Sequence, residues 1–171
     1  ILPPMQQISS KQSCFQSPNN KDVWFASCMR SSDRGKSWLK MDGCETVLTY
    51  NPYGKKEIYG LNGNDIVVSY DDGETWDLFF GFSEEGDQGI TALSDLSYDG
   101  INNIMYFAGP IGFGKIQNGI VEYLTDNLKE SDCCGGSNVC AVDPRYPDVI
   151  YVGSRGKKCV NSYGIQRSVD G

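Results

Sequence analysis

Short apolar runs alternate with polar turn residues along the whole chain, and no stretch carries the apolar spacing of a long amphipathic helix. The best helical stretch, residues 119–132, is short and ends in polar residues. Elsewhere, runs of β-branched and aromatic residues are interrupted by Asn, Asp, Gly and Pro, which is typical of strands joined by turns. The pattern predicts an all-β fold.

One element recurs four times: a turn with Pro or Asp, a few polar residues, and an apolar strand. The copies span residues 17–27, 51–62, 97–109 and 143–154, and they are anchored on Val23, Ile58, Ile104 and Val149. A loosely alternating strand precedes each copy and further strands follow, at a repeat of about 35–46 residues. Four strands per unit predict a β-propeller of four-stranded antiparallel blades, in one domain over 1–171. The expected blades are 10–45, 46–85, 90–130 and 138–171, the last incomplete.

Two octets, SSDRGKSW (31–38) and SYDDGETW (69–76), follow the third strand of their units. They share Ser31, Asp33, Gly35, Ser37 and Trp38 in one copy and Ser69, Asp71, Gly73, Thr75 and Trp76 in the other; a truncated copy begins with Ser168 and Asp170. We expect hairpin turns in which Asp accepts backbone N–H bonds, Gly takes positive φ and Trp packs back over the turn. The alternative, a calcium site, lacks the ligand spacing of an EF-hand.

The octets resemble Asp-boxes, the bacterial neuraminidase repeats of sialidase-like propellers. Their pairing with an NP…IYG strand (51–60) is most similar to xyloglucanase-type and sortilin-type propellers. The resemblance implies a propeller whose boxes lie at outer turns, away from the ligand-binding face. The third unit departs from the pattern, with Gln117 in place of Asp before Asn118-Gly119, and the fourth carries an insert at 155–164.

The number of blades is open on the sequence. Residues 5–9 could close a four-bladed ring, or the chain could belong to a tandem array. We favour a part of a larger propeller, because an unpaired last strand would expose a sheet edge.

The charge and composition of the chain disfavour some classes of binding partner and of catalytic site. The net charge of −7 and the lack of a basic cluster disfavour nucleic acid and anionic lipid. No apolar run approaches the roughly 20 residues of a membrane span, so no membrane insertion is expected. The chain has no histidine, which removes Ser-His and Cys-His catalysis and the commonest zinc ligand.

The cysteine pattern favours disulfides and an oxidising compartment, so we expect a secreted or lumenal protein. No CxxC pair occurs, and the odd count leaves one thiol free or paired outside the segment. The disulfide candidates are Cys14, Cys28, Cys44, Cys133, Cys134, Cys140 and Cys159.

No constellation marks a catalyst, metal site or cofactor. The arginine cluster of a sialidase is missing, and nothing in the spacing of Asp87, Asp95, Asp99 and Asp132 distinguishes them from ordinary loop residues. Two Gly-rich loops with Phe82 and Phe113 could carry recognition, or their aromatics could pack between blades. We expect a non-enzymatic role, binding a protein or glycan or self-associating. The alternative is a glycoside hydrolase whose catalytic residues lie outside the segment.

Overall fold

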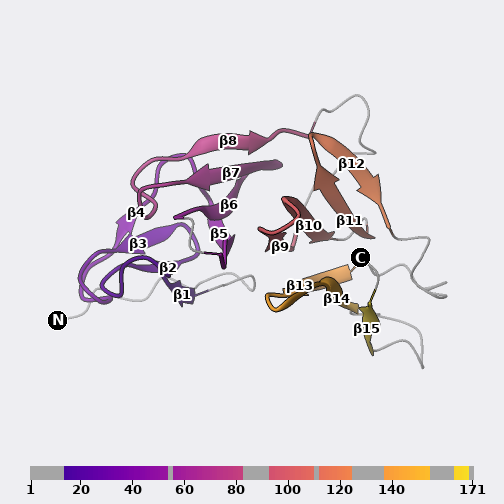
Figure 1. The fold of residues 1–171 in the computed structure, drawn as a ribbon. Helices are drawn as coiled ribbons and strands as arrows, with labels where there is room; N and C mark the ends of the chain where they lie inside the picture. Colours follow the sequence, from indigo (N-terminus) through magenta and orange to yellow (C-terminus); the bar gives the residue numbers. More distant parts are fainter. Residues whose placement is uncertain are drawn as a thin grey trace.

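The computed structural model describes residues 14–53, 56–82, 93–109, 112–124, 137–154 and 164–169. Within these ranges every regular element is a β-strand, and the strands form four antiparallel sheets that follow one another in an arc (Figure 1). The predicted all-β fold is confirmed. None of the described residues belongs to a helix long and apolar enough to cross a membrane.

Each sheet is a meander in which strand order follows the chain. The first contains β1 (Cys14–Gln16), β2 (Trp24–Ala26), β3 (Met29–Ser31) and β4 (Leu39–Lys40). The second contains β5 (Thr46–Tyr50), β6 (Ile58–Asn62), β7 (Asp65–Ser69) and β8 (Asp77–Phe80). The third contains β9 (Asp95–Asp99), β10 (Ile104–Gly109), β11 (Gly112–Gln117) and β12 (Ile120–Tyr123). The fourth has three strands among the described residues, β13 (Ser137–Asp143), β14 (Tyr146–Ser154) and β15 (Gly164–Ser168).

The hydrophobic core lies between the sheets, in three separate clusters. The first cluster joins sheets one and two through residues such as Phe25, Val47 and Ile58. The second joins sheets two and three, with Tyr59 and Phe107 among its members, and the third joins sheets three and four. Each inner sheet therefore has both faces buried, which explains why its central strands are apolar on both sides.

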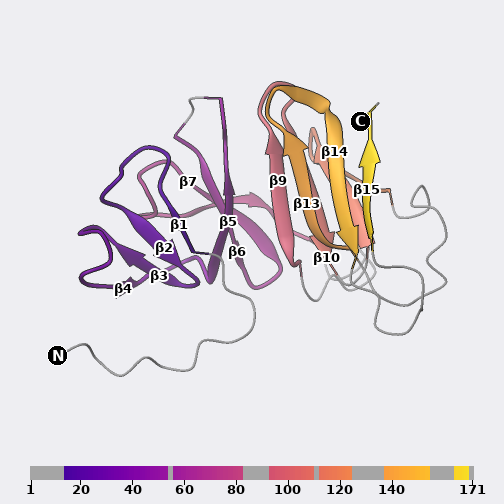
Figure 2. The same ribbon diagram turned by 90° about the horizontal axis from the view of Figure 1, so that it is seen from below.

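The strands nearest the centre of the arc also exchange polar contacts. β5, β9 and β13 lie side by side, as the views from the side and from below agree (Figures 1 and 2). Two backbone N–H groups of β13, those of Cys140 and Val142, donate to the side chains of Asp95 (3.0 Å) and Ser97 (2.9 Å) on β9. These bonds hold the third and fourth sheets together at their inner strands.

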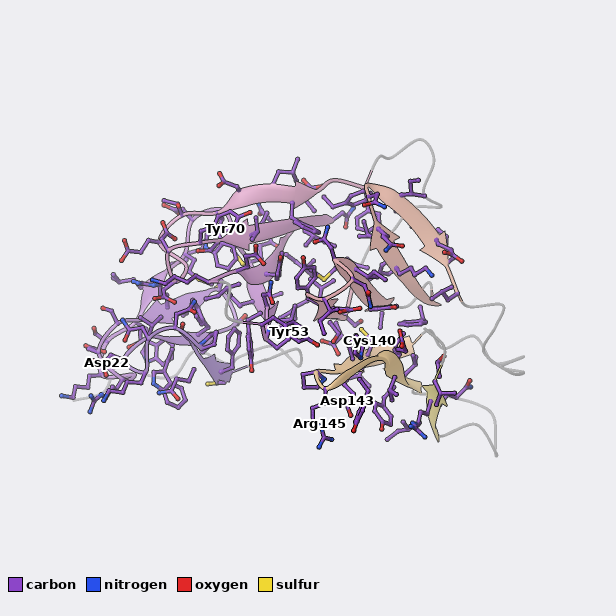
Figure 3. The ribbon with its side chains drawn as sticks, in the orientation of Figure 1. Asp22, Tyr53, Tyr70, Cys140, Asp143 and Arg145 are labelled. Carbon is purple, nitrogen blue, oxygen red and sulfur yellow. The ribbon has the colours of Figure 1, made fainter. Side chains whose placement is uncertain are left out.

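A further contact crosses from the second sheet to the fourth. The hydroxyl of Tyr53, just after β5, donates to the carbonyl of Pro144 at 2.6 Å. Figure 3 shows Tyr53 beside the β13–β14 turn that carries Asp143 and Arg145. This bond joins turns that lie 91 residues apart in the chain.

The structure corrects the sequence alignment of the repeat by one residue. The octet serines Ser31 and Ser69 pair across the hairpin with Trp24 and Ile58, and Ser168 pairs with Ile150. The anchors Val23 and Val149 therefore lie one position too early. The error matters because a shift of one residue exchanges the two faces of a strand. It arose because two apolar residues stand next to each other at both places, Val23-Trp24 and Val149-Ile150, and the sequence does not show which of them aligns with Ile58.

Gly73 lies at a close contact between the first two sheets. It has φ of +81°, and a Cβ there would lie 2.6 Å from Cε1 of Phe25 on the first sheet. Gly119 has a similar φ of +76° with nothing within 4 Å of its Cβ position. We expect Gly73→Ala to lower the free energy of unfolding by about 2–4 kcal/mol, against about 1 kcal/mol for Gly119→Ala. Urea denaturation measures both, and equal losses would contradict the close approach to Phe25.

Candidate functional site

The first octet hairpin (residues 31–38) is organised around one carboxylate. Oδ1 of Asp33 accepts from the backbone N–H of Ser37 (2.8 Å) and the hydroxyl of Ser31 (2.8 Å), while Oδ2 accepts from the hydroxyl of Ser37 (2.6 Å). The Ser31 oxygen in turn accepts from the N–H of Gly35 at 2.8 Å. Gly35 has φ of +82°, and the indole N–H of Trp38 donates to its carbonyl at 3.1 Å.

The second octet hairpin (residues 69–76) repeats this network. Oδ1 of Asp71 accepts from Ser69 and from the N–H groups of Glu74 and Thr75, and Oδ2 accepts from the Thr75 hydroxyl at 2.6 Å. Trp76 lies over its own turn, since a Cβ on Gly73 would come within 3.4 Å of its ring, and it also packs against the first cluster. Its buried indole N–H has no partner among the described residues. Both carboxylates are thus engaged by their own turns.

These bonds set the acidity of the two carboxyl groups. Hydrogen bonds from the Ser37 side chain, its backbone and Ser31 lower the pKa of Asp33 to about 2. Burial raises the pKa of Asp71, but the bonds from Thr75 and Ser69 outweigh it and the net shift is downward. Both groups are therefore ionised at neutral pH, in the state that the turns require.

The second octet hairpin also docks on the first sheet. Oδ1 of Asp72 accepts from the hydroxyl of Ser17 (2.6 Å) and the side-chain amide of Asn19 (3.2 Å). Arg30 on β3 donates Nε to the Asp72 carbonyl at 2.6 Å and forms an ion pair with Glu74 at 3.1 Å. The sequence did not reveal this junction, because Asp72 and Glu74 stand at the variable positions of the octet.

The first octet hairpin carries the opposite charge at the same positions. Arg34 replaces Asp72 and pairs with Asp22 of its own sheet at 2.6 Å, at the outer end of the molecule (Figure 3). Lys36 stands in the place of Glu74. The two hairpins share their internal bonds but present different surfaces.

The third and fourth units depart from the octet. Asn118 and Gly119 join β11 to β12 with φ of +53° and +76°, the paired positive values of a tight hairpin turn, so this turn forms without the Asp. Ser168 ends β15, opposite Ile150. Asp170 lies outside the described residues.

An open pocket of about 660 Å³ lies at the β1–β2 loop, where the sequence indicated nothing. It is lined by Gln16, Ser17, Pro18, Asn19, Asn20, Lys21 and Tyr50. The Tyr50 ring stacks on Phe15 at 6.4 Å and is 41% exposed. The amide of Gln16 donates to the Lys21 carbonyl, and Asn20 accepts from the N–H of Asp22, so the loop is held by its own side chains. The wall therefore combines an aromatic ring with amides and one ammonium group.

No protein-family model matches this chain, and the search of curated proteins found no match. Among solved structures, an ancestral GH74 enzyme is similar with a TM-score of 0.62 and 13% identity, over 91% of this chain and 25% of that one. The fold is a β-propeller built of blades. YCF48 from Cyanidioschyzon merolae is also similar, with a TM-score of 0.47 and 12% identity over 93% of this chain and 56% of that one. The chain thus spans about a quarter of the length of the GH74 enzyme.

Two of the four acidic residues considered for catalysis are described, and both serve the propeller's hydrogen bonding. Asp99 is fully buried and accepts from the N–H groups of Ile101 and Asn102. Asp95 accepts from Cys140 and Leu96, and burial raises its pKa. Asp87 and Asp132 lie outside the described residues. Nowhere in the described ranges do three or more metal-ligating side chains gather.

The disulfides expected of Cys14, Cys28, Cys44 and Cys140 are not formed in the structure, where these four described cysteines are free thiols. Cys44 is buried in the first cluster and Cys140 in the third, so the propeller keeps these two sulfurs apart. Burial raises the pKa of both, that of Cys44 to about 12. Cys133, Cys134 and Cys159 lie outside the described residues, and their disulfides stay a prediction.

The segment around Phe113, expected to be a loop, is strand β11, because it pairs with β10, and the aromatics of both Gly-rich segments pack against other rings of the propeller. Phe113 is buried and stacks on Tyr106, with ring centres 5.9 Å apart and planes at 6°. Phe82 packs edge-on against Phe80 and Phe107. Both rings therefore pack between blades, which is the alternative to a role in recognition. Residues 83–89 of the first loop lie outside the described ranges.

The depressed pKa of Asp33 predicts acid sensitivity of the first octet hairpin. A carboxyl whose folded pKa lies below its unfolded value stabilises the fold above about pH 4, and that contribution is lost as the pH falls toward 2. Replacing Asp33 with Asn should therefore lower the melting temperature at pH 6 more than at pH 2. Thermal unfolding of both proteins across this range measures the gap, and a gap that stays constant would contradict the assignment.

The junction at Arg30 predicts a second effect on stability. The Arg30 side chain is 16% exposed, and its removal leaves the Asp72 carbonyl without this donor. We expect Arg30→Met to lower the free energy of unfolding by about 1–3 kcal/mol. Arg34→Met is the matched control, because its ion pair is exposed and should contribute less than about 1 kcal/mol. Urea denaturation that ranks Arg34→Met as the more damaging would contradict the junction.

Proposed function

We propose that this chain is an Asp-box propeller segment of an extracellular or lumenal protein, with a non-enzymatic binding or structural role. The observation that carries the proposal is the use of its carboxylates. Asp33, Asp71, Asp95 and Asp99 all accept hydrogen bonds that hold turns or join blades. Carboxylates committed in this way are unavailable as general acid and base, which need a proton to exchange with substrate.

The ligand class we propose is a glycan, bound at the pocket of the β1–β2 loop. An exposed tyrosine face stacks on a sugar ring, and neighbouring amides bond its hydroxyls. Tyr50 and the amides of Gln16, Asn19 and Asn20 supply these groups within one wall. A protein ligand or self-association is the other outcome, and the net charge of −7 makes nucleic acid an unsuitable partner.

The second candidate is a carbohydrate-active enzyme, favoured by the likeness of the fold to a GH74 enzyme. In that case the catalytic groups come from sequence beyond the described residues. The extracellular placement rests on Cys133, Cys134 and Cys159, the three cysteines outside the described residues, because the four described ones are free thiols and disulfides form in an oxidising compartment.

A glycan panel titrated against the chain tests the proposal. We expect binding of a soluble β-glucan or sialoside without turnover, and Tyr50→Ala should weaken it about tenfold. Tyr70→Ala is the matched control, because Tyr70 is exposed but does not line the pocket. Release of reducing sugar or sialic acid by the chain would overturn the non-enzymatic role. Binding that Tyr50→Ala leaves unchanged would overturn the pocket assignment.

A further inference from the structure

The outer face of the last sheet carries an exposed apolar surface with one arginine. Across β13, β14 and β15, Ala141 pairs with Tyr151 and Tyr151 with Arg167, so their side chains share a face. Val139 and Ile165 lie on the same face, two residues along, and are 54% and 77% exposed. Within the described ranges no ion pair engages Arg167.

The same arrangement occurs in the first sheet, where it is covered. There Phe25 pairs with Arg30, as Tyr151 pairs with Arg167. Each arginine comes directly before the serine that begins an octet. Tyr151 and Arg167 therefore occupy the positions of Phe25 and Arg30 in the blade repeat.

The cover of the first sheet is the acidic octet hairpin of the next blade. Arg30 donates to the carbonyl of Asp72 and pairs with the carboxylate of Glu74. Phe25, 1% exposed, lies against Gly73, where a Cβ would come within 2.6 Å of its ring. At this junction, a glycine flanked by two acidic residues therefore packs against an arginine and a neighbouring aromatic ring.

We propose that the outer face of the last sheet is a binding site for an acidic octet hairpin of a further blade, one outside residues 14–169. Arg167 pairs with a carboxylate at the position of Glu74 and donates to the carbonyl at the position of Asp72. Tyr151 lies against the hairpin glycine, and the apolar side chains Val139 and Ile165 are buried beneath the incoming sheet. The site is independent of the glycan pocket and of whether the protein is an enzyme.

The charges of the two octet hairpins argue against a second copy of this chain as the molecule bound at the outer face of the last sheet. The octet hairpin at the open side of the first sheet presents Arg34 and Lys36, which would meet Arg167 with like charge. The acidic hairpin at 69–76 is already engaged by Arg30 and Ser17 of its own chain. The occupant is therefore a separate hairpin with carboxylates at these two positions.

A cyclised peptide with the sequence of residues 66–79 serves as the probe, titrated against the whole chain by fluorescence anisotropy. A control peptide carries Lys at the positions of Asp72 and Glu74. We expect the acidic peptide to bind at least about tenfold more tightly than the Lys peptide at low salt, with the difference shrinking as salt is added. Arg167→Glu, at an exposed position, should reverse the preference.

Three results would overturn the site. The first is binding of neither peptide, the second is equal binding of both, and the third is a preference that Arg167→Glu leaves unchanged. Sedimentation of the chain alone tests whether a second copy binds at this face. A dimer that Arg167→Glu dissociates would identify a second copy, rather than a further hairpin, as the bound molecule. Loss of glycan binding leaves all these readouts intact, so the two proposals fail separately.

Discussion

Face-to-face packing of consecutive sheets is the constraint on which this structure depends. A sheet of three or four short strands has too little interior to bury its apolar residues alone. The side chains of Tyr59, Phe107 and Ile58 are fully buried only because the next or the preceding sheet covers them. Every apolar cluster in the described residues spans two sheets, so no blade is stable independently of its neighbours.

The octet hairpins serve this packing at two levels. Inside the turn, Asp33 and Asp71 collect hydrogen bonds that fix the direction in which the chain returns. At the variable positions between these shared residues, Asp72 reaches the preceding sheet, where Ser17 donates to it. The residues that the two octets share therefore stabilise the turn inside each blade. The residues that differ between the octets determine which neighbouring sheet the hairpin can contact.

Several polar groups among the described residues join one sheet to another. Asp95 joins the third and fourth sheets, and Tyr53 joins the second and fourth. The β1–β2 loop instead has side chains that hold the loop itself, and the exposed ring of Tyr50 on β5 lies beside it. Such a loop on a rigid scaffold is where recognition is usually found.

Local alternation and turn residues predicted most of the strands, their order and the hydrogen bonds inside the octet turns, because each of these depends on residues within one hairpin. It placed the repeat one residue out of register at Val23 and Val149, since neighbouring apolar residues do not reveal which face they occupy. Packing between the sheets, which the sequence did not predict, buries Phe113, places Phe82 against the second cluster, and brings Asp72 to Arg30 across two sheets. Contacts between sheets join residues far apart in the chain, and no local pattern encodes which residues will face one another.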